Sequence, residues 1–517
     1  MFDSSKDRNW YVAIYLFILF LSVYFLTASG QVGFTDVGNA RIEVLKSLVS
    51  KHELTVPAGI GIKGADGREY SLFSIGSVVS AIPFYFLGKL IGVSPWSLIN
   101  IINQISGAVT VVLVFLFSVS LGYSKRAALY TSIVYGCCTM AWYYSKDSGD
   151  HTLETLFVLF SIYFMFQYSI NKKNLYFIFS IVSFGFAFIT RPTSVLIIPS
   201  LLILITDTTH DAEKFELKTA AKVLTRKILL FLVIFSPFLL LTFWYNYYRF
   251  GSIFETGYSL MAERLGLDFF SGTQLWTGLS GFLISPGKGF FYYSPVTVLF
   301  FFSIKSFIKK NFLPGLSFIV TIIFYLVFMS RYVYWHGDWA WGPRYLFVTM
   351  PFFLIPTAVL FDSRTWIEKK YSRRLIILIS AFSLFIQIAS VSVSPYKHFY
   401  SLMFEKNIKF DVVEGEGVQP IGEPPLETYF DWSKSPISAQ FKYMVEITKK
   451  IENYKYNELP SNAKLYDKVK IAPWFNTFDF WWIYKYFLRN SYSGFIGAIS
   501  ILLLALFSLS RLWMVVK

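Results

Sequence analysis

The stretch LFSIGSVVSAIPFYFLGKLIG at residues 72–92 decides the topology of this chain. A membrane-spanning helix needs about 20 mainly apolar residues, and this run is long enough. It also contains Pro83, two internal glycines and Lys89, which are less typical of a span. If it crosses a bilayer, every later connection changes side, so the charges of the other connections settle the question.

Twelve further apolar runs are candidate spans on either side of this stretch. They are residues 10–28, 98–121, 127–143, 153–170, 175–190, 193–206, 228–245, 291–308, 313–333, 346–361, 375–394 and 493–513. If 72–92 stays at the outer surface, alternate connections and the two ends carry 21 Lys and Arg on the inner side. Because basic residues accumulate in cytoplasmic loops, the charges favour twelve spans with both termini cytoplasmic.

Composition supports a chain that lies mostly in lipid. Of its 517 residues, 55% are hydrophobic, 20% are aromatic and only 15% are charged, whereas soluble domains carry about 25% charged residues. A soluble enzyme and a nucleic-acid binder are therefore excluded, and the net charge of +15 is explained by the cytoplasmic loops. The two cysteines, Cys137 and Cys138, are adjacent in an apolar run and provide no disulfide framework.

The predicted fold is an all-α polytopic membrane protein. We expect a transmembrane module at 1–394 with outer loops 29–97, 144–152, 246–290 and 334–345. A small mixed outer domain follows at 395–490, and 491–517 holds the last span and a cytoplasmic tail. Within the first loop, 36–51 has apolar residues near helical spacing. The 72–92 run is interpreted as a juxtamembrane helix pair broken at Pro83.

A group of polar residues follows the third span, in YYSKDSGDHTLE (143–154). Asp147, Asp150, His151 and Glu154 are spaced to share one helical face, where they could hold a divalent metal or an acceptor hydroxyl. The alternative is an acidic first turn that caps the following helix and suits its dipole.

Three cations lie at the outer ends of spans. Lys288 stands among glycines in SPGKG (285–289), Arg344 follows a proline in WGPRY (341–345), and Arg191 lies in TRP (190–192). Main-chain amides and cations of this kind can hold a phosphate. An ordinary turn with a lysine reaching the interface is the alternative for Lys288.

The common soluble-enzyme motifs are absent from the sequence. GIGIKG (59–64) fits G-x-G-x-x-G but lies in an outer loop without a strand–turn–helix context, so we reject a dinucleotide site. The sequence has no Walker loop, no H-E-x-x-H and no G-x-S-x-G. ATP-driven transport and conventional hydrolase chemistry therefore lose support.

Five pieces, in order between residues 66 and 356, carry a resemblance to a known superfamily. They are 66–88, 188–200, 246–258, 285–295 and 335–356. The chain resembles the integral-membrane glycosyltransferases of the GT-C class, which use polyprenyl-phosphate sugars. These include protein O-mannosyltransferases and the lipid A aminoarabinose transferase, and the bacterial members described as family-39-like are the most similar.

This resemblance implies roles for particular residues. An acid of the first outer loop, here Asp36, acts as general base or metal ligand, although Val37 follows where the family often has a second acid. The acid of the second outer loop corresponds to Asp147 or Asp150. Lys288, Arg344 and Arg191 are expected to stabilise the departing polyprenyl phosphate. Further candidates for substrate or metal binding are His151, Glu154, His336, Asp338, Glu255 and Tyr258; the candidate metal ligands are Asp36, Asp150 and His151.

The expected partners are a polyprenyl-phosphate sugar, a glycan, lipid or protein acceptor, and membrane lipids. A divalent metal is the one cofactor considered, and the expected location is a bacterial inner membrane with an extracytoplasmic active site. Three alternatives stay open. They are a lipid-linked sugar transporter or flippase, a polysaccharide ligase or polymerase using the same carrier, and a non-catalytic member whose outer domain binds glycan. A transporter would place ionisable residues along the mid-membrane helices, which are nearly free of charge here.

Overall fold

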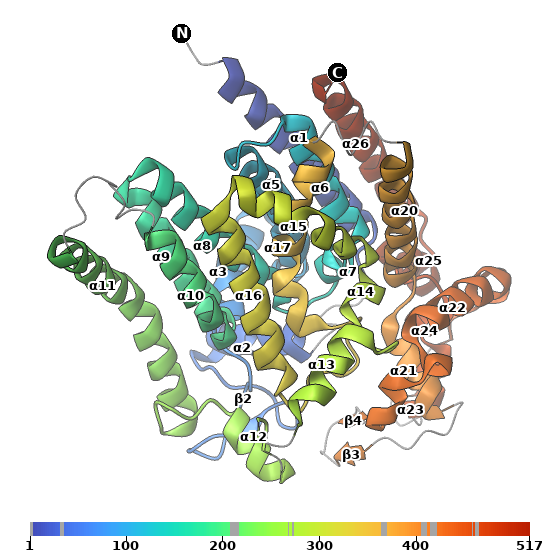
Figure 1. Cartoon of the computed structure of the whole chain (residues 1–517). Helices are drawn as coiled ribbons and strands as arrows, with labels where there is room; N and C mark the ends of the chain where they lie inside the picture. The colour runs from blue at the N-terminus through green and yellow to red at the C-terminus, as the bar shows by residue number, and fades with distance from the viewer. Residues whose placement is uncertain are drawn as a thin grey trace.

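Apolar helices build nearly all of the structure (Figure 1). The computed structural model describes residues 4–30, 36–206, 217–266, 268–270, 273–362, 370–404, 411–413, 421–457, 459–460 and 465–516. In these ranges the strands form two antiparallel pairs, β1 (Ile62–Lys63) with β2 (Glu69–Tyr70) and β3 (Asp411–Val413) with β4 (Ile421–Glu423). The predicted all-α membrane class is confirmed, and the chain is an integral membrane protein.

Eight helical segments in the described ranges are long and apolar enough to cross a bilayer. They lie in α1 (Ser4–Leu26), α4 (Pro95–Ile99) with α5 (Ile102–Ser120), α8 (His151–Asn171), α11 (Leu217–Phe250), α16 (Phe312–Ser330), the segment Arg344–Asp362, α20 (Lys370–Ser392) and α26 (Ser493–Val516). The other four predicted spans form shorter helices. These are α6 (Lys125–Cys138), α9 (Asn174–Thr190), α10 (Ile198–Thr206) after η1 (Pro192–Ile197), and α15 (Leu299–Lys310) after α14 (Phe290–Tyr293) and η3 (Pro295–Val298). The count of twelve is therefore not confirmed.

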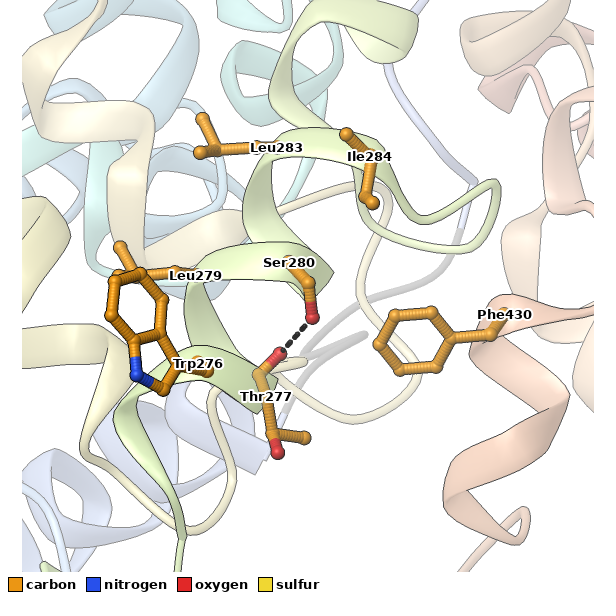
Figure 2. Close-up of a pocket in the computed structure, with 7 residues that line it drawn as sticks. All are labelled: Trp276, Thr277, Leu279, Ser280, Leu283, Ile284 and Phe430. Carbon is orange, nitrogen blue, oxygen red and sulfur yellow. Dashed lines mark hydrogen bonds between the residues drawn. The ribbon is translucent and has the colours of Figure 1, made fainter.

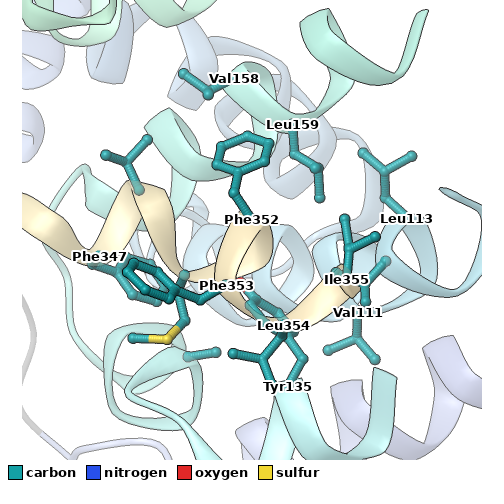
Figure 3. Close-up of a cluster of buried hydrophobic side chains, with 14 of the residues drawn as sticks. Val111, Leu113, Tyr135, Val158, Leu159, Phe347, Phe352, Phe353, Leu354 and Ile355 are labelled. Atoms are coloured by element: carbon teal, nitrogen blue, oxygen red, sulfur yellow. The ribbon is translucent and has the colours of Figure 1, made fainter. Parts of the chain in front are cut away.

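The segment Arg344–Asp362 runs through the middle of the bundle. It comprises η4 (Arg344–Thr349), α17 (Met350–Leu354), η5 (Ile355–Thr357) and α18 (Ala358–Asp362), and 83% of it is buried. Its side chains, among them Phe352 and Ile355, pack in one cluster with apolar residues of α5, α6 and α8 (Figure 3). Apolar side chains on all sides are expected of a helix enclosed by other helices. Arg344 is consequently fixed at one end of the most buried span.

Both termini lie at the same end of the molecule, where α1 packs along α26 (Figure 1). The long connections gather at the opposite end, which we call the loop end. It holds β1 and β2, α2 (Asp36–Lys51), α3 (Gly76–Ile91), α7 (Ala141–Lys146), α12 (Tyr258–Leu265) and α13 (Leu275–Ile284).

The 72–92 run forms a single helix, so the predicted break at Pro83 is wrong. α3 continues through Pro83 and ends at Gly92, whose left-handed backbone (φ 70°) reverses the chain before α4. Proline removes one main-chain donor, and a helix can tolerate the loss with a bend. At 16 residues, α3 is shorter than the eight candidate spans.

Between residues 395 and 490, the described residues form the β3–β4 pair and short helices that pack on the bundle. The helices are α21 (Pro395–Phe404), α22 (Pro436–Lys450), α23 (Leu465–Ile471), α24 (Pro473–Asn476) and α25 (Trp481–Arg489). The rings of Phe385 in α20 and Phe441 in α22 stack with their centroids 4.5 Å apart. Residues 415–420, in the stretch expected to be a loop, lie outside the described residues.

Candidate active site

Two segments that are distant in sequence meet at the loop end. α2 begins at Asp36, and its first turn abuts the 147–150 loop. A Cβ atom on Gly38 would lie 2.4 Å from Ser148 Oγ and 3.0 Å from the Ser148 carbonyl oxygen. The side chain of Asp36 itself lies outside the described residues. The start of α2 therefore lies next to residues 147–150, which we call the acidic loop. The resemblance implies that acids of these two loops belong to one site.

The close approach of α2 to Ser148 requires a glycine at position 38, and this requirement can be tested. Gly38→Ala is expected to destabilise the protein by about 1–3 kcal/mol, the usual effect of overpacking a tight contact. Thermal unfolding in detergent would measure the loss. Ser148→Gly removes the side chain that the new Cβ meets and is expected to restore part of it; an unaffected Gly38→Ala variant would contradict the contact.

Buried side chains hold the 147–150 loop by its main chain. Asn103 Nδ2 donates to the carbonyl oxygens of Asp147 and Gly149, the latter at 2.7 Å. Arg41 Nη2 donates to Gly149 O at 3.3 Å, and burial lowers the pKa of this guanidinium to about 10. Both donors are buried, so they fix where the loop's acids stand.

Asp147 is a buried acid in extended backbone before the helix. α8 begins only at His151, so the prediction that Asp147 and Asp150 share a helical face with His151 and Glu154 is wrong. Burial raises the pKa of Asp147 to about 6, opposed by a 2.7 Å hydrogen bond from the Ser148 amide and by the charge of Arg344. Among the described residues, Asp147 forms no ion pair.

Asp150 and Glu154 are instead bound by Arg191. Its Nη1 lies 2.8 Å from Asp150 Oδ1, and its Nε lies 3.3 Å from Glu154 Oε2. Tyr325 donates to Glu154 Oε1 at 3.3 Å. His151 Nε2 lies 3.4 Å from Arg191 Nη1.

These partners do not fit a metal centre. A guanidinium already occupies the position between Asp150 and Glu154 that a cation would take, and it also approaches the His151 ring. Within the described ranges, no three His, Cys, Asp or Glu residues are grouped closely enough to hold an ion.

Arg191 and Arg344 approach the same aromatic ring. Their Cζ atoms lie 5.5 Å and 4.9 Å from the centroid of Tyr345. Arg344 Nη2 also donates to Asp338 Oδ2 and to Tyr345 Oη, each at 2.9 Å. Tyr258 lies near this group, and burial raises its pKa to about 12. The result is a pair of cations beside the acidic loop.

Lys288 and His336 are joined to the loop that carries Arg344. Lys288 Nζ donates to the carbonyl oxygens of Asp338 and Ala340, at 2.8 Å and 2.6 Å. The His336 ring stacks on Tyr429, with centroids 4.6 Å apart. Burial lowers the pKa of His336 to about 3, so this ring is neutral near pH 7. In this structure Lys288 holds the main chain of residues 338–340, and a phosphate near Lys288 would therefore also lie near this loop.

The remaining candidate, Glu255, lies in the loop between α11 and α12. Its Oε1 accepts a hydrogen bond of 2.9 Å from the Gly257 amide. It therefore fixes its own turn and is not bound to the arginine pair. Arg41, Asn103 and Tyr345 were not predicted as site residues, because a lone arginine on an amphipathic helix and an amide in an apolar span carry no distinctive spacing.

An apolar groove of about 600 Å³ lies beside this end of the molecule (Figure 2). Six of its lining residues belong to α13, and the seventh is Phe430; they are Trp276, Thr277, Leu279, Ser280, Leu283, Ile284 and Phe430. The neighbouring Tyr429 ring lies 5.6 Å from Lys288 Nζ. Phe430 and Tyr429 thus connect the groove to Lys288 and to the 334–345 loop that Lys288 holds. We call Lys288 and this loop, which carries Arg344, the basic loop.

Comparison with known proteins supports the predicted resemblance. Residues 83–241 match the family described as dolichyl-phosphate-mannose-protein mannosyltransferase. No curated protein matches the sequence significantly. The resemblance to membrane glycosyltransferases that use lipid-phosphate sugars is therefore confirmed over the matched residues.

Two solved proteins are similar at low identity. ArnT from Cupriavidus metallidurans, solved with undecaprenyl phosphate, is 14% identical, with 98% of this chain and 78% of ArnT covered and a TM-score of 0.48. The Archaeoglobus fulgidus oligosaccharyltransferase, tethered with an acceptor peptide, is 12% identical, with 81% of this chain and 61% of that chain covered and a TM-score of 0.48. Both similarities are distant, and no residue role is transferred from them.

Proposed function

We propose that this protein transfers a sugar from a polyprenyl-phosphate donor to an acceptor at the loop end of the membrane bundle. One observation carries the proposal. The start of α2, the buried acid Asp147 and the cations Arg191 and Arg344 come together at one end of a helical body that is otherwise nearly free of charge. The family match over residues 83–241 supports the same donor class.

In the proposed reaction an acceptor hydroxyl attacks the anomeric carbon of the sugar. The new carbon–oxygen bond forms as the bond from that carbon to the phosphate oxygen breaks, and the hydroxyl proton passes to a carboxylate. Asp36 is the proposed base, with Asp147 beside it. The departing polyprenyl phosphate gains negative charge, so Arg344 and Arg191 stabilise the transition state more than the ground state.

The groove along α13 suits the hydrocarbon part of the donor. Its lining is almost entirely apolar, and it leads through Phe430 and Tyr429 to Lys288. A long prenyl chain in this position would hold its phosphate near the basic loop.

The orientation, location and domain boundaries are also proposals. The loop end is taken to face outward from a bacterial inner membrane, because basic residues concentrate in the connections at the opposite end. Residues 1–394 would then form the catalytic module, 395–490 the outer domain, and 491–517 the last span and tail. The sugar is proposed to be a hexose or a pentose, and the acceptor a glycan, a lipid or a protein.

The pH dependence of sugar release tests the role of Asp147. Since burial raises its pKa to about 6, the acid is protonated below that pH and can no longer accept a proton or stabilise positive charge. The rate is expected to fall about tenfold per pH unit below about pH 6. Proteoliposomes supplied with polyprenyl-phosphate sugars would provide the measurement.

Asp147→Asn is the matched variant for this profile. This variant should be slow, and its rate should not fall further below about pH 6. Asp66 is an exposed acid of the first outer loop, and Asp66→Asn should keep this fall in rate, the acidic limb of the profile. An unchanged limb in Asp147→Asn would remove Asp147 from the proposed mechanism.

A further inference from the structure

A buried ion pair lies next to the acidic loop and is not part of the chemistry proposed above. Lys146 Nζ lies 2.8 Å from Asp479 Oδ2, and the two side chains are 2% and 0% exposed. The same ammonium donates to the carbonyl oxygens of Val391 and Asp479, each at 2.6 Å. Lys146 directly precedes Asp147, so its position and that of the loop are coupled through the chain.

Asp479 connects further segments to this lysine. Its Oδ1 accepts hydrogen bonds from Ser29 Oγ at 2.7 Å and Tyr484 Oη at 2.6 Å. Its amide donates to Ser392 O at 2.9 Å. The carboxylate of Asp479 thus joins the ends of α1 and α7 to α25, and its main-chain amide adds the end of α20.

Residues 479–484 also form hydrogen bonds with the end of α1 and pack against it. The Trp481 amide donates to Ala28 O at 3.0 Å, and the Trp481 indole N–H donates to Phe25 O at 2.9 Å. A Cβ atom on Gly30 would overlap the Tyr484 ring, at 2.1 Å from Cδ2. These contacts fix the end of α1 and the residues that follow it as far as Gly30, six residues before Asp36.

Stability alone does not account for a pair of this kind. Removing two charges from water is costly, and apolar residues of similar volume often replace a buried ion pair without loss of stability. What apolar residues would not reproduce is a single group that donates to two carbonyls and joins three chain segments. Directional hydrogen bonds fix relative positions in a way that apolar packing does not.

We propose that Lys146 and Asp479 form a positioning pair that sets the Asp147 loop and residues 26–30 at the end of α1 relative to each other, so that the 479–484 segment positions the active site without entering it. The proposal rests on the proposed function for its catalytic consequence. Its structural content, that the pair orders residues 26–30 and 144–150, is independent of that function.

The test uses the full-length double variant Lys146→Met with Asp479→Leu, which removes both charges and leaves neither partner unpaired. We expect a lower melting temperature, because the Val391 and Asp479 carbonyls and the Ser29 and Tyr484 hydroxyls lose their partners, and at least tenfold faster amide hydrogen exchange in residues 26–30 and 144–150. With an active donor, kcat should fall at least tenfold while KM for the donor stays within about twofold, since the basic loop is untouched. The acidic limb of the pH profile should also shift.

Two further variants make the outcome decisive. Arg68→Met with Glu53→Leu removes an exposed pair with a 2.8 Å contact and should behave like the unsubstituted protein in every readout. If the first double variant does not fold, Ser29→Ala with Tyr484→Phe removes only the two hydroxyl donors to Asp479 and should accelerate exchange in the same peptides.

Unchanged exchange and unchanged kcat in a folded double variant would overturn the positioning role. If the unsubstituted protein consumes no donor, the proposed function fails, and the exchange measurement still decides whether the pair orders the two segments.

Discussion

Asp36→Asn is expected to lower sugar transfer by roughly 10²–10⁴-fold, the usual contribution of a general base, with little effect on folding. Asp36 opens α2, and the first turn of that helix lies against Ser148 in the acidic loop. Asparagine has nearly the same shape as aspartate, but it cannot take up the hydroxyl proton. Initial rates of transfer in proteoliposomes, with a melting curve beside them, would measure both effects.

Glu43→Gln is the matched control for this prediction. Glu43 lies on the same helix and forms an ion pair of 2.6 Å with Lys46, and partly exposed pairs of this type contribute little to stability. The control should retain its rate. Equal rates in all three proteins would exclude Asp36 as the base and leave Asp147 as the remaining acid.

Arg191→Met is expected to cost about 3–5 kcal/mol of folding free energy, because it leaves charged partners buried without a counter-ion. Arg191 lies within 3.3 Å of both Asp150 and Glu154, which are only 4% and 3% exposed. Unfolding in detergent, followed by temperature or denaturant, would measure the loss.

Two variants separate this effect from a general sensitivity to losing a charge. Lys450→Met breaks the 2.9 Å contact with Glu446, in which the lysine side chain is 72% exposed, and should change stability by less than about 1 kcal/mol. Combining Arg191→Met with Asp150→Asn and Glu154→Gln should recover part of the loss. Stability equal to that of the unsubstituted protein in Arg191→Met alone would contradict the buried network.

The sequence allowed the membrane class to be predicted, because hydropathy and the distribution of Lys and Arg directly reflect the bilayer. It did not allow the partners of Asp150 to be predicted. Helical spacing predicted that the acids share one face of a helix. In the structure α8 starts only at His151, and Arg191, at the junction of α9 and η1, binds Asp150. Such contacts depend on tertiary packing, which local periodicity does not describe.

The same limit explains the residues that were missed. Lys146 stands in no motif that would single it out, and its partner Asp479 lies 333 positions away. A long-range pair leaves no spacing signal in one sequence. The length of the short helices was also overestimated, because an apolar run does not reveal where an extended residue such as Thr139 ends a helix.

The most direct test of the central claim is donor turnover by the purified, unsubstituted protein with a panel of radiolabelled polyprenyl-phosphate sugars. The proposed function predicts that at least one donor is consumed, with free polyprenyl phosphate formed in equal amount to the sugar released or transferred. Donors that remain intact while the labelled lipid moves across the bilayer would contradict a glycosyltransferase and indicate a transporter.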